Sequence, residues 1–287
     1  MKRKRFSAGV TAFTEIRRIF LDPRLLTVGM LLVFIYSLVT RELFTRADKT
    51  GLPINVAECF VAVGSSGVLL LFLPSVFLIL ISDFPNMGEH TLYTISRVGR
   101  LRWLFGQLLA ALLSAVIFVL GMLAACCIMT APKGFWGFEW SDTATKYASM
   151  FPNERYTLMS QYLPSNLFNQ LSFTNALLNT VFLLILYLFT LSLIIMLFRI
   201  CGKRAAGIAA AFGVVAAGVL TCAIKTDAMW AFPMANTITW LHYDTALRKP
   251  VVPMYFSYVY FAALIIIGIA ANITAVRKVN INTMEAE

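Results

Sequence analysis

One short motif in the sequence has residue types that could perform hydrolysis. Gly64-Ser65-Ser66-Gly67 places a serine between glycines inside a hydrophobic segment. Such a serine becomes a nucleophile only when a general base lies within hydrogen-bonding reach. The two histidines are His90, predicted on the opposite side of the membrane, and His242, which lacks a glycine four residues earlier for close helix contact. Because small residues in membrane helices usually serve packing, an intramembrane serine protease is the least favoured interpretation.

Ionisable side chains, which ion-coupled carriers need within the membrane, are missing from the long hydrophobic segments. Six segments between successive charged residues contain no Asp, Glu, Lys or Arg. Glu58 and Asp83 stand at the two ends of the second segment, where membrane interfaces are expected. Intramembrane ionisable residues normally mark ion and substrate pathways. The sequence therefore favours an energy source other than a bound coupling ion.

Motifs for nucleotide, metal or redox chemistry are also missing from the sequence. It holds no G-x-x-x-x-G-K-[ST], the loop that cradles nucleotide phosphates. The chain is therefore not expected to hydrolyse ATP, and we predict no enzymatic activity. The five cysteines form no C-x-x-C pair and lie in or beside hydrophobic segments, which is typical of small apolar core residues. We assign no catalytic residue, metal ligand or cofactor to the chain.

The composition and the spacing of charges predict an all-α polytopic membrane protein. Hydrophobic residues make up 59% of the 287 positions and charged residues only 13%. A helix needs roughly 20 apolar residues to cross a bilayer core of about 30 Å. The six uncharged windows therefore predict six transmembrane helices in a single domain covering 1–287, near residues 24–41, 60–82, 104–130, 173–198, 205–224 and 255–276.

The distribution of Lys and Arg predicts the orientation of these helices. Fifteen of the 24 Lys and Arg residues fall in segments 1–24, 83–102, 199–204 and 277–287, which share one side of a six-span chain. Because cytoplasmic loops are enriched in these residues, we predict both termini in the cytoplasm and external loops at 43–58, 133–172 and 225–254. The net charge of +10 then reflects topology and attraction to membrane lipid, not nucleic-acid binding.

The first 22 residues predict an amphipathic helix lying in the cytoplasmic interface. Val10, Phe13, Ile16 and Phe20 recur at a spacing that forms one apolar stripe, flanked by Arg17 and Arg18. Asp22-Pro23, a good cap and first-turn pair, then turns the chain into the membrane. An ordinary basic tail is the alternative.

Small residues dominate the fifth predicted helix. Gly207, Ala211 and Gly218 share one helical face, and such faces let helices approach closely. We predict that this face serves helix packing within the bundle or a dimer contact. Lining a permeation path is the alternative.

The segment 84–97 is a basic, helix-competent stretch where a short turn would connect two spans. Asp83-Phe84-Pro85-Asn86 interrupts the preceding helix, and Glu89 would lie in the first turn of a new one, where the helix dipole favours a carboxylate. Leu92 and Ile95 would form an apolar ridge beside Tyr93. A short helix of this kind can dock in a groove of a soluble partner. A solvated positive loop is the alternative.

The stretch "GEHTLYTISRVGRLRWLFGQ" at 88–107 resembles the segment between the second and third spans of permeases of the type-2 ATP-binding-cassette export class. The matching positions are Glu89, Thr91, Leu92, Arg97 and Gly106, although Gln107 replaces the usual lysine and Glu and Gly are in reversed order. The N-terminal helix, the six spans and the aromatic loop before the last span agree with that class.

This resemblance implies a permease subunit in the cell membrane that exports a hydrophobic or amphipathic substrate. It implies two partners: a cytoplasmic ATP-binding-cassette ATPase, which holds ATP and Mg, and a second copy of the permease or a homologous one. The coupling helix that contacts the ATPase would span 84–97 and use Glu89, Thr91, Leu92, Tyr93, Ile95 and Arg97. A secondary carrier and a scaffold or immunity factor, neither needing an ATPase, remain alternatives.

Overall fold

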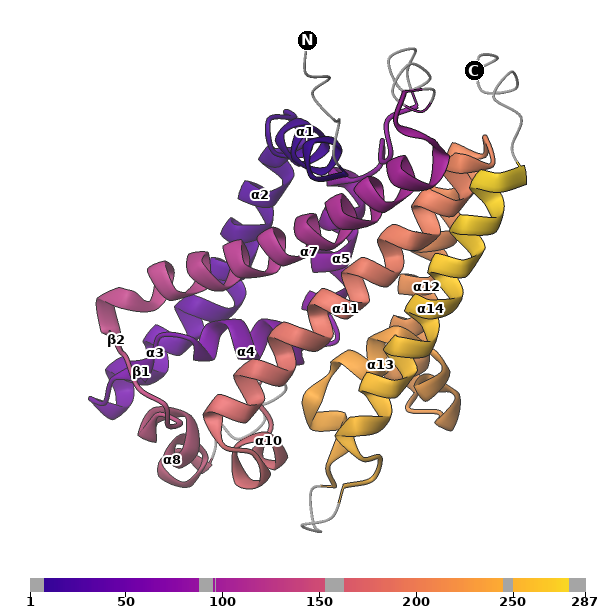
Figure 1. The fold of residues 1–287 in the computed structure, drawn as a ribbon. Helices are drawn as coiled ribbons and strands as arrows, with labels where there is room; N and C mark the ends of the chain where they lie inside the picture. The colour runs from indigo at the N-terminus through magenta and orange to yellow at the C-terminus, as the bar shows by residue number, and fades with distance from the viewer. Residues whose placement is uncertain (1–7, 88–94, 96, 153–162, 245–249, 279–287) are drawn as a thin grey trace.

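The computed structural model describes residues 8–87, 95, 97–152, 163–244 and 250–278. These residues are mostly helical, and the long helices lie side by side along one axis (Figure 1). The start of α1 and the end of α14 lie at the same end of the bundle. We call this end, with residues 81–87 and 199–204, the α1 end. The opposite end, with β1, β2, α8, α10 and residues 225–253, is the sheet end.

Among the described residues, five helical segments are long and apolar enough to cross a membrane. The first is continuous from Leu25 to Thr50 and consists of α2 (Leu25–Ile35), the π-helix η1 (Tyr36–Thr40) and α3 (Arg41–Thr50). The others are α7 (Arg100–Thr130), α11 (Phe173–Ile200), α12 (Arg204–Ile224) and α14 (Met254–Lys278). The expectation of a helical, membrane-spanning chain is therefore confirmed at this level.

The second predicted span is not one helix. It consists of α4 (Glu58–Ser65) and α5 (Leu69–Leu80), which meet at an angle of 91° and make a sixth crossing only if the bent pair is counted as one. Ser66 between them has an extended backbone, and its Oγ accepts a hydrogen bond from the N–H of Leu69 at 3.2 Å. Serine in this position caps the start of a helix. The glycine-serine motif therefore forms a helix break.

The first span extends nine residues beyond its expected end at residue 41 and occupies part of the segment assigned to a loop. Most charged residues of α3, such as Arg41, Asp48 and Lys49, are exposed, but one is covered by the rest of the chain. Arg46 is almost fully buried, forms an ion pair with Glu42 at 3.7 Å and lies 4.4 Å from the centre of the Tyr147 ring. The helix ends at Gly51, whose φ of +67° is a left-handed conformation that glycine adopts without strain.

A short two-stranded sheet departs from the expected all-helical architecture. β1 (Ile54–Asn55) pairs in parallel with β2 (Gly134–Phe135), with Ile54 opposite Gly134. The Thr130 hydroxyl donates to the Val56 carbonyl oxygen at 2.7 Å. These contacts fasten the end of α7 to the segment that leads into α4.

Short helices complete the sheet end. They are η2 (Ala131–Lys133), α8 (Asp142–Met150), α10 (Ser165–Gln170), η4 (Asp227–Ala231), α13 (Pro233–Thr237) and η5 (Thr239–His242). The α13–η5 segment is buried, and the Trp240 ring N–H donates to the Ser65 carbonyl oxygen at 2.8 Å. The predicted loop 225–254 therefore packs against the break between α4 and α5. Non-helical backbone at this depth is tolerated because protein surrounds it.

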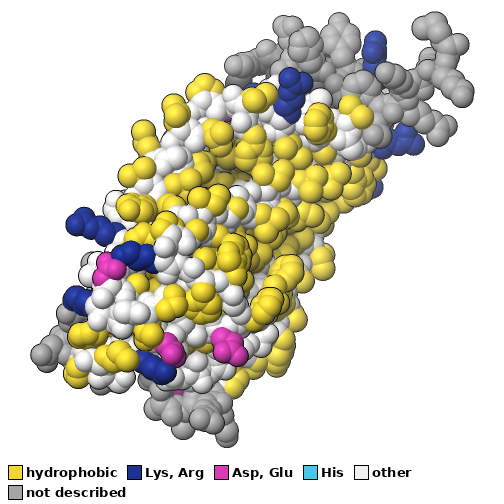
Figure 2. Space-filling view, turned by 90° about the vertical axis from the view of Figure 1, so that its left-hand side faces the viewer, with side chains coloured by type: hydrophobic (Ala, Val, Ile, Leu, Met, Phe, Trp, Pro, Cys, Tyr) yellow, Lys and Arg dark blue, Asp and Glu magenta, His cyan; other side chains and the backbone are white. Residues whose placement is uncertain are grey.

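The hydrophobic surface is arranged as a membrane protein requires. α11 lies in the middle of the bundle and has the most buried side chains, whereas α2, α12 and α14 expose most of theirs. Figure 2 shows one face whose middle is covered by hydrophobic side chains, with charged side chains gathered toward its two ends. An exposed apolar band of this width suits a lipid environment.

Candidate functional site

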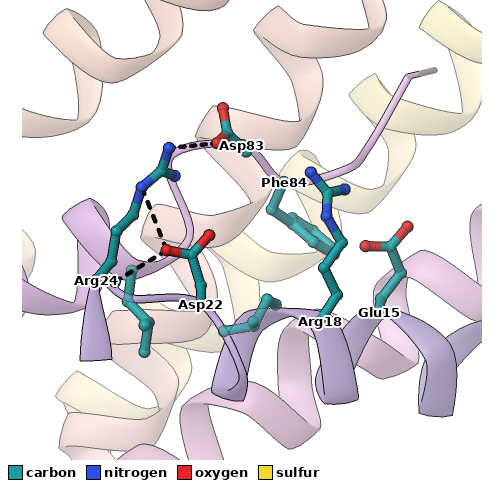
Figure 3. Close-up of a pocket in the computed structure, with 8 residues that line it drawn as sticks. Glu15, Arg18, Asp22, Arg24, Asp83 and Phe84 are labelled. Atoms are coloured by element: carbon teal, nitrogen blue, oxygen red, sulfur yellow. Dashed lines mark hydrogen bonds and ion pairs between the residues drawn. The ribbon is translucent and has the colours of Figure 1, made fainter. Parts of the chain in front are cut away.

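Charged residues from distant parts of the chain meet at the α1 end (Figure 3). The first group forms where the chain turns from α1 (Ala8–Phe20) into α2. Asp22 Oδ1 accepts a hydrogen bond from the Arg24 backbone N–H at 2.9 Å, and the Asp22 carbonyl oxygen accepts one from Leu25 at 3.0 Å. The Asp22-Pro23 turn thus delivers Arg24 to the end of the first span.

Asp83 joins three spans through two ion pairs. Its Oδ2 lies 2.5 Å from Arg24 Nη2, and its Oδ1 pairs with Arg204 at the start of α12. Arg24 also donates to the Ser82 hydroxyl at 2.7 Å. Asp83 follows the end of α5, so one carboxylate holds the ends of α2, α5 and α12 together. Arg100 at the start of α7 similarly donates to the Arg277 carbonyl oxygen near the end of α14, at 3.3 Å.

The α1 helix is seated closely on α7. A Cβ at Gly106 would lie 2.9 Å from Thr11 Cβ and 3.1 Å from the Ala8 carbonyl oxygen, so only glycine allows this approach without rearrangement. Thr11, Ala12 and Ile19 are buried in the contact. The next residue on α7, Gln107, donates its side-chain N–H to Glu15 at 3.4 Å. Gly106 and Gln107 therefore position α1.

Glu15 connects α1 to the segment that follows Asp83. Its carboxylate accepts a hydrogen bond from the backbone N–H of Asn86. Burial raises the pKa of the Glu15 carboxyl above its usual value of 4.5, while Gln107, the Arg18 charge and the Asn86 N–H each lower it. Arg18 and Glu15 lie beside Phe84 in Figure 3. The start of the predicted coupling segment is thus bonded to α1.

The described ends of segment 84–97 are both anchored in the core. Phe84 is buried at one end, and Ile95 at the other, with Val98 beside it. Gly99 then turns the chain into α7 with φ of +90°, a conformation that favours glycine. Ile95, expected on an exposed ridge, is instead packed against the chain's own core. Arg97 is exposed, and Glu89, Thr91, Leu92 and Tyr93 lie outside the described residues.

The residues predicted for the interfacial helix take three different environments. Val10 and Phe13 are exposed, Phe13 at 68%. Ile16 and Phe20 are partly buried against the core. Arg17 and Arg18 are exposed on the last turn of α1. The helix therefore uses its small and polar face to contact α7 and leaves Val10 and Phe13 outward, where apolar side chains suit a lipid surface.

The small-residue face of α12 is buried against the same chain. A Cβ at Gly207 would lie 2.7 Å from Phe198 Cβ of α11, and one at Gly218 would lie 2.8 Å from Met234 Cβ of α13. Ala211 lies between them and is fully buried. The three residues predicted for helix packing or a dimer contact thus all face neighbours within the bundle.

The serine and histidine that could have formed a nucleophile and its base have other partners. Ser66 caps α5, as described above. His242 bonds to the Val252 carbonyl oxygen through Nδ1 at 2.9 Å and to the Ser257 hydroxyl through Nε2 at 3.1 Å. Burial lowers the pKa of His242 below its usual 6.5. Hydrogen bonds to the backbone of Val252 and Asn236 raise the pKa, but by less. This His242–Ser257 pair is fully buried, which leaves no room for a substrate.

The cavity that the described residues form at the α1 end is small. The cavity among Glu15, Arg18, Asp22, Arg24 and Asp83 measures about 20 Å³, room for about one water. Among the residues that the structure describes, no three His, Cys, Asp or Glu side chains form a metal-binding group. The arrangement is therefore a frame that connects helix ends.

Sequence reasoning noted Asp83 only as an interface marker and missed its two ion pairs and the Glu15–Asn86 bond. One signal was available, because Arg24, Asp83 and Arg204 each stand at the edge of an uncharged window.

Comparisons with protein-family models, curated proteins and solved structures found no match to this chain.

Proposed function

We propose that this chain is the membrane-spanning permease subunit of an ATP-driven transporter, energised by a separate ATPase on the side of the α1 end. One observation carries the proposal. The segment 84–97 has a buried residue near each end, Phe84 and Ile95, within a frame that links the ends of five spanning elements. A displacement of this segment would reach those elements through Asp83, Glu15 and α7.

The mechanism uses binding energy from outside the chain. An ATPase that holds segment 84–97 differently with and without ATP would favour one bundle arrangement over the other, because a ligand shifts an equilibrium only through differential affinity. The α1 helix, bonded to Asn86 through Glu15, would move with the segment. The proposal places both termini in the cytoplasm and the protein in the cell membrane, where the Lys- and Arg-rich α1 end matches the positive-inside rule.

The test replaces Leu92 and Tyr93 together with aspartate and measures ATP hydrolysis that co-purifies with the chain from native membranes in mild detergent. Loss of most of this hydrolysis is expected, since two buried charges at an interface are strongly unfavourable. The matched control replaces Phe138 and Val251, exposed apolar residues of the sheet end, with aspartate. Hydrolysis should persist in the control. Hydrolysis that survives the first replacement, or is missing from the wild type, overturns the proposal.

A further inference from the structure

An apolar groove of about 440 Å³ lies near the sheet end, far from the charged frame. Its long wall is the final third of α7, where Leu120, Leu123, Ala124, Cys127 and Ile128 contribute side chains. Leu177 of α11 forms the opposite wall, Ala57 lies at the start of α4, and Trp136 follows β2. In Figure 1, α7 and α11 diverge toward this end.

The lining specifies the kind of ligand that the groove can hold. Its walls are aliphatic side chains, a thiol and one tryptophan, with no charged residue among them. Its volume is within the range of about 300–1,000 Å³ that is typical of small-molecule sites. Such a lining offers dispersion and hydrophobic contact but no ion pair. The ligand portion inside must therefore be a hydrocarbon.

The dimensions of the groove select among apolar occupants. Leu120 and Ala131 mark its two ends along α7, and at about 1.5 Å per residue they lie ~16 Å apart. One leaflet of the bilayer core is about 15 Å thick. About 440 Å³ spread along this length is much less than the volume of a helix from a second protein copy, which is about 10–12 Å wide. The groove therefore matches one leaflet in length and suits a hydrocarbon chain better than a helix.

The end of the groove at Ala131 and Trp136 has features of a headgroup region. Trp136 and Phe138 are 78% and 84% exposed, and aromatic side chains of this kind gather at membrane interfaces. Lys133 lies between Ala131 and Trp136 in the chain and pairs with Asp48. An ammonium group carries three N–H donors, so this pairing leaves capacity for a phosphate oxygen.

We propose that this groove binds one acyl chain of a phospholipid from the leaflet at the sheet end, with the phosphate near Lys133. With Ala131 at the headgroup level, Leu120 lies near the bilayer centre. The terminal carbons of the acyl chain therefore contact Leu120 and Leu123, and the carbons next to the glycerol contact Ile128 and Trp136. The site requires no ATPase, so its occupancy is independent of the proposed function.

The experiment uses the full chain in phosphatidylcholine vesicles that contain one of two photoreactive phosphatidylcholines. One carries a diazirine at the end of an acyl chain, and the other carries it near the glycerol. Adducts are located by mass spectrometry after irradiation. The first probe should label residues 120–123 and the second residues 131–136. Labelling of each groove segment should exceed labelling of the exposed face of α14 by about fivefold, because a bound acyl chain stays at its site longer than a passing one.

Three variants of α7 make the test more specific. Ala124→Phe fills the groove and should lower labelling of residues 120–131 by about fivefold. Gly121→Phe is the matched control, because a Cβ there meets nothing within 4 Å and Gly121 does not line the groove. Its labelling should stay near the wild-type level. Ala124→Leu and size-exclusion chromatography check that a loss of labelling is not a loss of folding.

Three results would overturn the proposal. Equal labelling of the groove and α14 would mean that the groove holds only passing lipid. Absence of adducts from residues 120–131 would mean that another occupant, such as a second copy, covers the groove. Unchanged labelling in a folded Ala124→Phe variant would place the bound chain elsewhere.

Discussion

The two carboxylates that bracket the bent second span are held in contrasting ways. At the sheet end Glu58 is fully buried and accepts hydrogen bonds from the Ser141 N–H at 2.6 Å, the Ser141 hydroxyl at 2.8 Å and the Asn55 N–H at 3.3 Å. At the α1 end the Asp83 side chain is about 26% exposed and pairs with Arg24 and Arg204. One end is held by buried directional hydrogen bonds, and the other by partly exposed charges.

This difference bears on which end can move. A buried carboxylate whose donors would otherwise be unsatisfied fixes a single arrangement of the chain. Ion pairs near water exchange one partner for another at low cost, because solvent compensates for a lost contact. We therefore expect the sheet end to be rigid and the α1 end to be adjustable, as a segment that receives force from a partner requires.

The largest effect is expected from Glu58→Ala. It would leave the buried N–H groups of Ser141 and Asn55 without their acceptor and should lower the free energy of unfolding by about 3 kcal/mol. Thermal unfolding of the purified chain in detergent measures this. Glu139→Ala is the matched control, since Glu139 is exposed on the same loop, and it should change stability by less than about 0.5 kcal/mol. Equal destabilisation by both variants would show that Glu58 does not hold the sheet end.

The sequence indicated the spans but not what holds their ends. Uncharged windows are a local property, so 173–198 and 205–224 agree closely with α11 and α12. The bond between Glu58 and Ser141 joins residues 83 positions apart, and no local pattern reports such a pairing. Arg46 was expected in a loop over 43–58 because its charge suggested solvent, whereas Tyr147 covers it. The glycine-serine motif around Ser66 was predicted to serve helix packing. Small residues also occur where helices break, so residue type alone does not distinguish the two roles.

A smaller effect is expected from Asp83→Asn, and it should depend on salt. Loss of the pairs with Arg24 and Arg204 should lower stability by about 1 kcal/mol at low ionic strength, after allowance for solvent exposure. The effect should shrink in 1 M salt, where charges are screened within about 3 Å. Thermal unfolding at both ionic strengths measures the difference. Asp227→Asn, at an exposed carboxylate of the sheet end, serves as the control. A salt-independent loss at Asp83 would contradict the contrast between the ends.

The smallest expected effect is an opposite response of the two ends to pH. Docked Glu15 keeps its proton to a higher pH than the free carboxyl, whose pKa is 4.5, so docking of α1 weakens as pH rises from 4.5 through the raised pKa. Docked His242 resists protonation, so docking of residues 236–242 weakens as pH falls through 6.5 toward the lowered pKa. The α1 end therefore loosens as pH rises, whereas residues 236–242 at the sheet end loosen as pH falls.

Hydrogen exchange measured by mass spectrometry at several pH values, corrected for intrinsic rates, follows α1 and residues 236–242 separately. Glu15→Gln should remove the pH dependence in α1 alone, because it keeps an acceptor for Asn86 but cannot titrate. His242→Gln should remove it in residues 236–242 alone. If both ends opened together at one pH, the bundle would respond as a single unit, and the adjustable α1 end would have no separate existence.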